Sequence, residues 1–247
     1  MQRVLVWDLV VRAFHWFLVA TLVATFAFAL GTDDESAAFS WHMALGLVAA
    51  ALVVLRLGWG LVGTRWARFS SFVFGPSEVL RYLRSSLPGA AATRYVGHNP
   101  GSSVAIFSSL ALVVGLGLTG LAMSNGSHAA EEMHEVLAYS LLAVVGLHLA
   151  GVAWHWLRHR ENLTRSMIDG RKQAMPDEAI ASSSPVAASI FVALSAGVAA
   201  TVIAGHSPST RQLTLPLIST TLTLGGDRGG EHGDGHDRQH DEREDHD

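Results

Sequence analysis

Five long stretches without Asp, Glu, Lys or Arg constrain this chain more than any other feature. They cover residues 13–32, 36–55, 95–130, 136–157 and 179–210. Roughly 20 apolar residues in a helix cross a bilayer core about 30 Å thick. The third and fifth stretches exceed that length, and Pro, Gly and Ser residues near their ends trim them to about 104–124 and 185–204. The sequence therefore predicts an all-α protein with five transmembrane helices.

The amino-acid composition limits which redox cofactors the chain could bind. Charged residues make up 15% of the chain, against about 25% in soluble domains. Cys is absent, which excludes disulfides, thiolate metal sites, cysteine-held iron–sulfur clusters and covalent haem attachment through C-x-x-C-H. Redox chemistry would then require metal or haem bound by His, or a flavin or quinone. We expect no nucleic-acid partner.

The first apolar stretch has an alternative interpretation as a secretory signal peptide. Arg3 would be its basic start and residues 26–29 its small-residue cleavage site. We favour a retained helix, because the run is long for a signal sequence. It also carries Arg12, His15 and Trp16, which a discarded segment has no need of.

Basic residues alternate between the connections. The connection 63–103 holds Arg65, Arg68, Arg81, Arg84 and Arg94, and the segment after the fourth stretch holds Arg158, Arg160, Arg165, Arg171 and Lys172. The other two connections hold Asp33, Asp34 and Glu35, and Glu131 and Glu132. By the positive-inside rule, we expect the N-terminus and both basic segments to be cytoplasmic, and the odd fifth helix would then export the C-terminal tail. Residues 76–87 within the first basic connection predict an interfacial amphipathic helix.

The histidines of the apolar stretches form pairs by depth. His134 and His148 are 14 residues apart, so on one helix they share a face and are separated by roughly 21 Å. Measured from the acidic boundary, His15 and His148 lie roughly 25 and 24 Å deep, whereas His42 and His134 both lie near that boundary. His155 would lie roughly 34 Å deep, too deep to pair with His15. We call His15 and His148 the inner pair, and His42 and His134 the outer pair.

Each pair predicts one haem with two axial imidazoles. Such a haem has no open coordination position for oxygen, so its function is electron transfer. Gly46, Ala138 and Gly151 follow three of these histidines by one helical turn and leave space for a flat macrocycle. A helix-to-helix hydrogen bond is the alternative for any single histidine, but four that match by depth favour two b-type haems.

Other polar residues could contact a cofactor. Arg12 and Arg56 are candidates to bind haem propionates, and anchoring at the cytoplasmic surface explains them equally well. His98 with Asn99 could hydrogen-bond a quinone oxygen near the inner haem. For the run 97–100 we favour the simpler interpretation, a turn that begins the third helix.

An ordered set of short motifs runs from about residue 4 to residue 172. It comprises Val6-Trp7-Asp8, Arg12, His15-Trp16, His42, Leu45-Gly46, Arg56, Gly58-Trp59-Gly60, Gly63, Ala67-Arg68-Phe69, Gly75-Pro76, Gly97-His98-Asn99-Pro100, Thr119-Gly120, His134-Glu135, His148, Arg160-Glu161-Asn162-Leu163, Met167-Ile168 and Gly170. This set resembles the bacterial di-haem cytochrome b561 family, which includes the b-type cytochrome subunit of nickel-iron hydrogenases. The resemblance implies a four-helix bundle with two b haems that passes electrons between quinone and a redox partner. By position, it implies that the ligands are His15, His42, His134 and His148.

The chain beyond the resemblance is organised differently. We expect a di-haem domain at 1–173, a linker at 174–184, a fifth transmembrane helix at 185–206, a periplasmic segment at 207–224 and a disordered tail at 225–247. Residues 213–224 partly alternate Leu with Thr or Ser, which predicts a short strand or a partner-binding segment.

The tail is rich in His, Asp and Glu. It carries His232, His236, His240 and His246 among nine acidic and three basic residues. Too few apolar residues are present for a core, so we expect disorder. These side chains could bind divalent nickel, zinc or copper loosely; a solvated acidic tail is the alternative.

Together these features predict an inner-membrane electron carrier, or the cytochrome subunit of an oxidoreductase complex. It would connect the quinone pool with a periplasmic partner such as a c-type cytochrome or a hydrogenase-like oxidoreductase, and the oligomeric state stays open, a homo-oligomer included. Two alternatives remain: a self-contained oxidoreductase that passes electrons from a small molecule such as superoxide to quinone, and a haem-free metal permease that uses the intramembrane and tail histidines.

Overall fold

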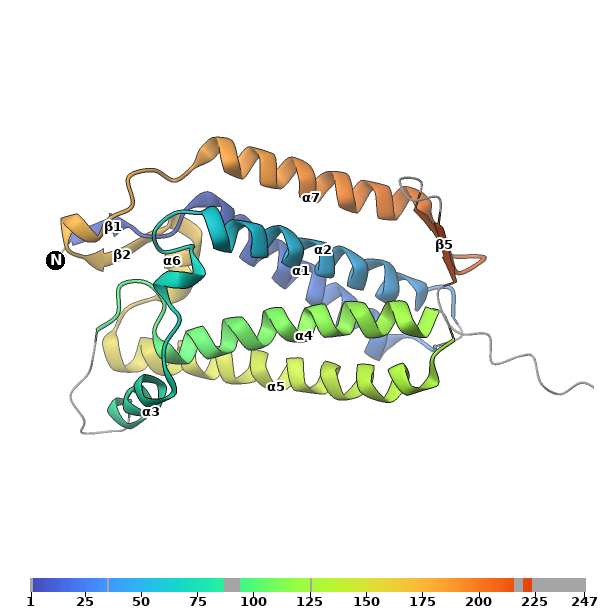
Figure 1. Cartoon of the computed structure of the whole chain (residues 1–247), viewed down its shortest axis with the longest axis horizontal. Helices are drawn as coiled ribbons and strands as arrows, with labels where there is room; N and C mark the ends of the chain where they lie inside the picture. The colour runs from blue at the N-terminus through green and yellow to red at the C-terminus, as the bar shows by residue number, and fades with distance from the viewer. Residues whose placement is uncertain (1, 35, 87–93, 125, 216–219, 224–247) are drawn as a thin grey trace, which may run out of the picture.

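A computed structural model describes residues 2–34, 36–86, 94–124, 126–215 and 220–223 (Figure 1). This part of the chain contains five helices long and apolar enough to cross a membrane: α1 (Leu9–Gly31), α2 (Ser40–Val62), α4 (Pro100–Ser124), α5 (His128–His159) and α7 (Pro185–Gly205). The prediction of five apolar helices long enough to cross a membrane is confirmed, and the fold is mostly helical, with two small sheets in addition.

Three of the long helices, α1, α2 and α5, extend beyond their apolar runs at the charged ends. α1 begins at Leu9 and includes Arg12, and α2 continues past Arg56 to Val62. The predicted ends differ because each run was cut at the first charged residue. A helix keeps its backbone hydrogen bonds through such a residue, so charge does not mark the helix end.

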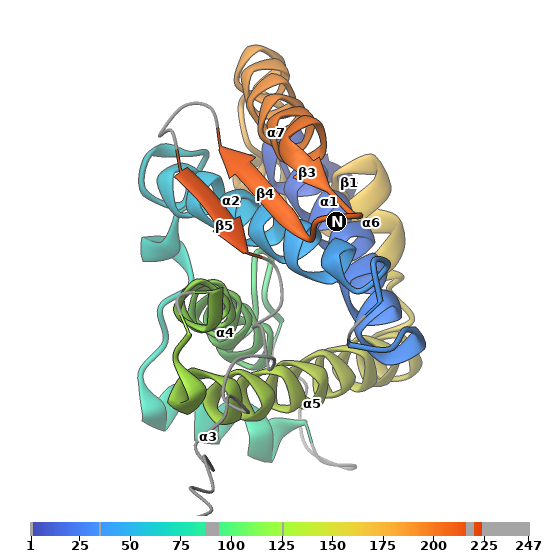
Figure 2. The same ribbon diagram turned by 90° about the vertical axis from the view of Figure 1, so that its right-hand side faces the viewer.

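The five long helices form three layers. α1 packs along α2, α4 packs along α5, and α2 also contacts α4. α7 lies against α1 and α2 on the side away from α4 and α5 (Figure 2). The buried core therefore follows α2, where Val48, Leu52 and Val53 pack with Leu110 of α4 and Phe191 of α7.

The outer surfaces of the helices remain apolar. Leu30 of α1, Val62 of α2 and Leu147 of α5 are 75%, 77% and 73% exposed. Many large apolar side chains are exposed on all five long helices, and extensive exposed apolar surface is rare on soluble monomers and marks interaction or membrane surfaces. Bilayer lipid covers such side chains in a multi-pass membrane protein.

Short elements distinguish the two ends of the bundle. One end, which we call the basic end, carries β1 (Gln2–Leu5), η1 (Phe69–Ser71), α3 (Pro76–Ser85), α6 (Leu163–Asp169), β2 (Arg171–Ala174) and η2 (Pro176–Glu178). The opposite, acidic end carries β3 (His206–Ser207), β4 (Gln212–Leu215) and β5 (Thr220–Thr223). β1 pairs antiparallel with β2, and β3, β4 and β5 form an antiparallel sheet in that order.

Several of these elements match sequence-based expectations. α3 occupies most of the segment predicted as an amphipathic helix, and the alternating segment 213–224 contributes to β4 and β5. The expected linker 174–184 begins with the last residue of β2. Strand β1 was not predicted. The tail 225–247, with its four histidines, lies outside the described residues.

Candidate functional site

The outer pair joins α2 and α5 near the acidic end. The ring centres of His42 and His134 are 6.1 Å apart, and their planes are 79° apart. Two imidazole nitrogens on opposite sides of a shared metal, each about 2 Å from it, stand about 4 Å apart and place their ring centres roughly 6 Å apart. The observed separation therefore fits one metal held between the rings.

The hydrogen bond of His42 fixes which ring nitrogen carries the proton. Its Nδ1 lies 3.1 Å from the backbone oxygen of Thr25 in α1. A carbonyl oxygen can only accept a hydrogen bond, so Nδ1 is the protonated nitrogen that donates. In the neutral ring, Nε2 then keeps its lone pair and is available as a metal ligand.

His134 reaches the same state through a hydroxyl group. Its Nδ1 lies 2.9 Å from Oγ1 of Thr119 in α4, and Thr119 Oγ1 donates its one proton to the backbone oxygen of Gly115 at 2.9 Å. The hydroxyl therefore accepts from Nδ1 of His134, and Nε2 again keeps its lone pair. Metal-bound histidines usually donate their second ring nitrogen to an oxygen in this way.

The inner pair joins α1 and α5 toward the basic end. His15 and His148 lie close enough to interact electrostatically. Nδ1 of His15 is buried and has no hydrogen-bond partner among the described residues, and the ring meets that of Trp16 edge-on at 5.0 Å. The structure thus brings together the same two pairs that the depth argument selects.

Space is available beside these histidines. A Cβ added at Gly46 or Gly151 would meet no atom within 4 Å, and one at Gly120 would lie 3.7 Å from the ring of His134. Within the described part of the chain, no group of three or more His, Cys, Asp or Glu side chains could hold a metal ion. Pairs of imidazoles suit haem, because the macrocycle supplies the other four ligands and the protein supplies two.

Arg56 is a buried cation whose guanidinium lies 5.9 Å from the ring centre of Phe14, the residue before His15. Its side chain is 3% exposed, and its guanidinium lies 5.0 Å from the ring centre of Phe69. Nη2 donates to the backbone oxygen of Ala67 at 3.0 Å, whereas Nη1 is buried without a hydrogen-bond partner among the described residues. An unpaired buried donor on a cation is costly, so this group is suited to bind an anion.

Asp8 is the nearby buried anion. It is 0% exposed and interacts electrostatically with Arg56. Its carboxylate accepts hydrogen bonds from Val11 N at 2.8 Å, Trp59 Nε1 at 3.1 Å and Thr64 Oγ1 at 2.6 Å. Asp8 thus caps the first turn of α1 and also fixes the far end of α2.

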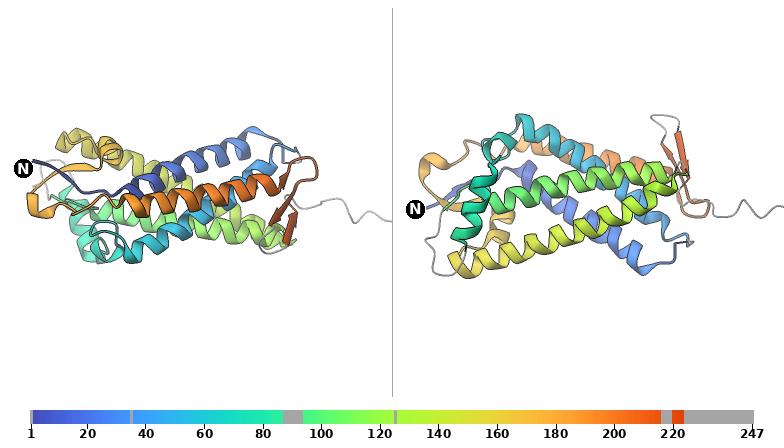
Figure 3. Two further views of the ribbon diagram at one scale, coloured as in Figure 1. Left: turned by 90° about the horizontal axis from the view of Figure 1, so that it is seen from above. Right: turned by 60° about the horizontal axis from the view of Figure 1, so that its bottom comes forward.

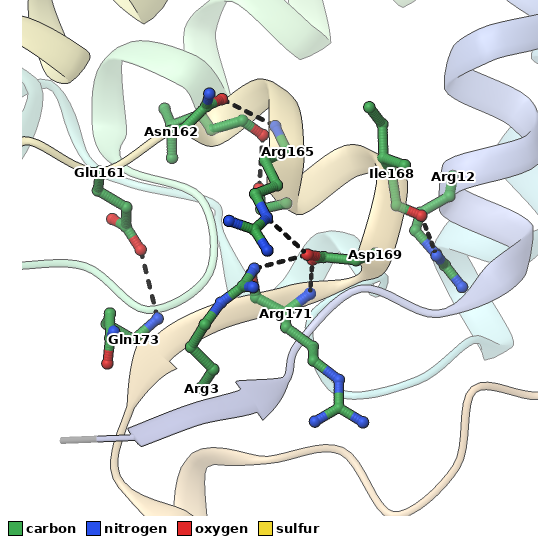
Figure 4. A network of polar contacts seen from close by, with 11 residues as sticks. Arg3, Arg12, Glu161, Asn162, Arg165, Ile168, Asp169, Arg171 and Gln173 are labelled. Atoms are coloured by element: carbon green, nitrogen blue, oxygen red, sulfur yellow. Dashed lines mark hydrogen bonds and ion pairs between the residues drawn. The ribbon is translucent and has the colours of Figure 1, made fainter.

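Arg12 has a different environment from Arg56. Its Nη1 donates to the backbone oxygen of Ile168 at 2.5 Å, and Nε donates to that of Asp8 at 3.4 Å. Beside it, Asp169 accepts from Arg3 at 2.7 Å (Figure 4). These contacts hold α6 and β2 against the start of α1.

His98 is packed between two aromatic rings. Its ring centre is 4.6 Å from that of Trp7 and 4.4 Å from that of Phe72. Burial, and then the positive charges of Arg56 and Lys172, lower the pKa of His98 to about 3. The ring is therefore neutral at pH 7, and its buried Nε2 has no hydrogen-bond partner in the described part of the chain.

Two neighbouring polar residues serve other contacts. Asn99 Oδ1 accepts from the backbone N of Ser102 at 2.8 Å, so Asn99 takes part in the turn that begins α4. His155, which the depth argument excludes as a ligand, has Nε2 3.2 Å from Glu161 Oε2 and stacks on His159.

The sequence did not predict the hydrogen-bond partners of His42 and His134. Thr119 entered only as part of a motif, although a hydroxyl inside an apolar run is a signal for a local hydrogen bond. Thr25 contacts His42 through its backbone, which no side-chain pattern reveals. A signal for Asp8 was present, because an Asp just before an apolar run is a typical helix N-cap.

The fold and the site together define a class: a multi-pass bundle of apolar helices with paired histidines inside it. Residues 6–170 match the sequence profile of the family described as prokaryotic cytochrome b561. The match covers well over half of the chain, and the protein belongs to this family. Comparison with curated proteins and with solved structures gave no match. Family membership indicates a membrane b-type cytochrome that binds haem b and transfers electrons.

The hydroxyl of Thr119 is a testable support for His134. In Thr119→Val, Nδ1 of His134 loses its acceptor, and loss of such outer contacts typically weakens metal binding about 10- to 100-fold. We expect faster haem loss from the outer site and a higher midpoint potential for that haem, since the imidazole becomes a poorer donor to ferric iron. Redox titration and haem transfer to an acceptor protein measure both; unchanged values would show that the contact is incidental.

Proposed function

We propose that this protein carries electrons across the bacterial inner membrane between a periplasmic redox partner and the quinone pool, using two haems b with two axial histidines each. His15 and His148 hold the inner haem, and His42 and His134 hold the outer haem. The observation that carries the proposal is the outer pair, in which both Nδ1 atoms face oxygen acceptors and both Nε2 atoms are left to bind metal. When bound, haem supplies reversible one-electron chemistry.

The orientation of the protein across the membrane follows from the distribution of its charged residues. The basic end holds Arg65, Arg68, Arg165 and Arg171, among other basic residues, and the opposite connections hold acidic residues. The basic end therefore faces the cytoplasm. The N-terminus is cytoplasmic, and the segment after α7 is periplasmic.

Arg56 and His98 are the polar groups proposed for the inner site. Arg56 binds a propionate of the inner haem, supported by the unpaired Nη1 in a buried environment. His98 donates a hydrogen bond to a quinone oxygen, supported by its neutral ring and unpartnered Nε2. Arg12 is the weaker propionate candidate, because Ile168 and Asp8 already accept from its guanidinium.

The decisive experiment is a reduced-minus-oxidised absorption spectrum of the detergent-purified protein, with haem quantified per chain. The expected result is a b-type spectrum with about two haems per chain. A haem-free protein after expression with ample haem would overturn the proposal and favour the metal permease. Reduction of quinone by superoxide with the purified chain alone would identify a self-contained oxidoreductase.

The chain beyond the cytochrome domain has separate roles in this proposal. Residues 1–173 form the di-haem domain, 174–184 connect it to the fifth helix at 185–206, and 207–224 lie in the periplasm. The tail 225–247 binds divalent metal loosely through His232, His236, His240 and His246.

Deletion of residues 225–247 tests the independence of the tail. We expect unchanged haem content and spectrum, because none of the four proposed ligand positions lies in it. Nickel binding, measured by calorimetry on protein from which divalent metal has been removed by a chelator, should be lost in the same variant. A large loss of haem would show that the tail takes part in haem delivery or folding.

A further inference from the structure

The fifth helix is an addition to the family domain that packs onto it closely. It follows the matched residues 6–170 in sequence and lies along α1 and α2 (Figure 3, left). Ala188, Phe191, Ser195 and Val202 are its buried residues. α7 is therefore an integral layer of the described structure. The last turn of α7, which lies at the acidic end of the bundle, has a fixed position relative to α2.

The sheet after α7 fixes the position of the residue that ends the helix. A Cβ on Gly205 would collide with the backbone oxygen of Thr214, so only glycine permits β4 to approach the helix this closely. Leu213 of β4 is 1% exposed within the core cluster that contains Ala44 and Val48 of α2. His206 is thereby held at the junction between helix and sheet.

His206 contacts the first turn of α2. It is 9% exposed, and its Nε2 lies 2.8 Å from Oγ of Ser40. Ser40 is itself 0% exposed and donates its one hydroxyl proton to the backbone oxygen of Ala37 at 2.6 Å. The Ser40 oxygen must then accept the hydrogen bond that His206 Nε2 donates. The ring of Trp41 meets His206 edge-on at 4.3 Å.

This turn carries the outer ligand His42. Phe39, the N-cap residue just before the helix, has no side chain able to cap it, so the position of the turn depends on tertiary contacts. Phe39 stacks on His42 at 5.3 Å, and Ser40 and Trp41 both contact His206. The α7 layer thus fixes the two residues directly before the ligand.

We propose that His206 is a positioning residue for the outer haem: by donating to Ser40, it holds the first turn of α2 so that His42 faces His134. The inference rests on the proposed function, in that it requires a haem at the outer pair. It assigns to the fifth helix a role in setting the geometry of that haem. His206 acts through α2 and does not itself contact iron.

The test compares His206→Ala, His206→Gln and Ser40→Ala in the full-length protein. Gln keeps a donor near the position of Nε2, whereas Ala removes it. His128→Ala is the matched control, because His128 is an exposed histidine at the same end of the bundle. Each variant is assayed for haem release to excess apomyoglobin and for the low-spin ferric electron paramagnetic resonance signal of each haem.

The haem content of the wild-type chain is measured first, and two haems per chain would support the proposed function. Fewer than two would overturn the proposed function, and with it the basis of the His206 proposal, whatever the His206 variants show. Given two haems, we expect His206→Ala and Ser40→Ala to release the outer haem about tenfold faster, the lower range for lost outer contacts, and to shift its signal. The inner haem should behave as in the wild type in every variant. In His206→Gln and His128→Ala, the outer haem should also match the wild type. Unchanged outer haem, or equal loosening of both haems, would overturn the proposal. The proposal would also be overturned if both alanine variants failed to fold and His206→Gln did not restore folding, because His206 would then be needed for folding itself.

Discussion

His15→Ala and His148→Ala should each lose the same haem, leaving about half of the wild-type haem per chain and one identical residual spectrum. The two histidines of the inner pair lie on different helices, His15 on α1 and His148 on α5. The variants should nevertheless have the same effect, because a site with two axial imidazoles fails when either one is missing. His42→Ala and His134→Ala should lose the other haem, and their shared residual spectrum should differ from that of the inner variants. Pyridine haemochrome content with redox titration measures both features.

The control for this set is His155→Ala. His155 lies on α5, one heptad after His148, and contacts Glu161, so both haems should be retained. Matching residual spectra in His15→Ala and His42→Ala would contradict the pairing, because those residues belong to different sites. Loss of both haems in every ligand variant, with loss of folded protein, would show that the haems are not independent. Charge-neutral His→Gln variants would then repeat the comparison with less change in volume.

The sequence predicted the helical architecture and the pairs because both follow from one-dimensional distances. Helix rise converts the spacing of His134 and His148 into depth, and apolar run length gives the number of spans. The pairs depend on depth alone, so errors in the helix ends at Arg12 and Arg56 did not affect them. The haem ligation itself remains a prediction.

Contacts between distant segments could not be predicted in the same way. Arg12 and Arg56 look alike in sequence, and the structure separates them: Arg12 donates to Ile168, while Arg56 is buried with an unpaired nitrogen. His206 lies 166 residues from Ser40, and no local pattern relates the two. The backbone oxygen of Thr25 carries no side-chain signal at all. Such contacts arise only when the helices pack.

Asp8→Ala should be strongly destabilising, by about 3 kcal/mol or more, because each donor left without its acceptor in a buried environment costs about 1–3 kcal/mol. The variant leaves three donors without their acceptor, from Val11, Trp59 and Thr64. It also removes the negative charge that acts on the buried Arg56. Thermal loss of the reduced b-type absorbance in detergent, followed with and without dithionite, measures the change.

Two variants separate the charge from the hydrogen bonds. Thr64→Val removes one hydrogen bond to Asp8 and should cost only about 1 kcal/mol. In Asp8→Asn, shape and part of the hydrogen bonding remain but the negative charge is lost, so its destabilisation should lie between the other two. If Asp8→Asn were as stable as the wild type, the charge of Arg56 would have to be balanced by another anion. A haem propionate is the proposed one, and the double variant Asp8→Asn with His15→Ala, which lacks the inner haem, should then lose the stability that Asp8→Asn alone retains.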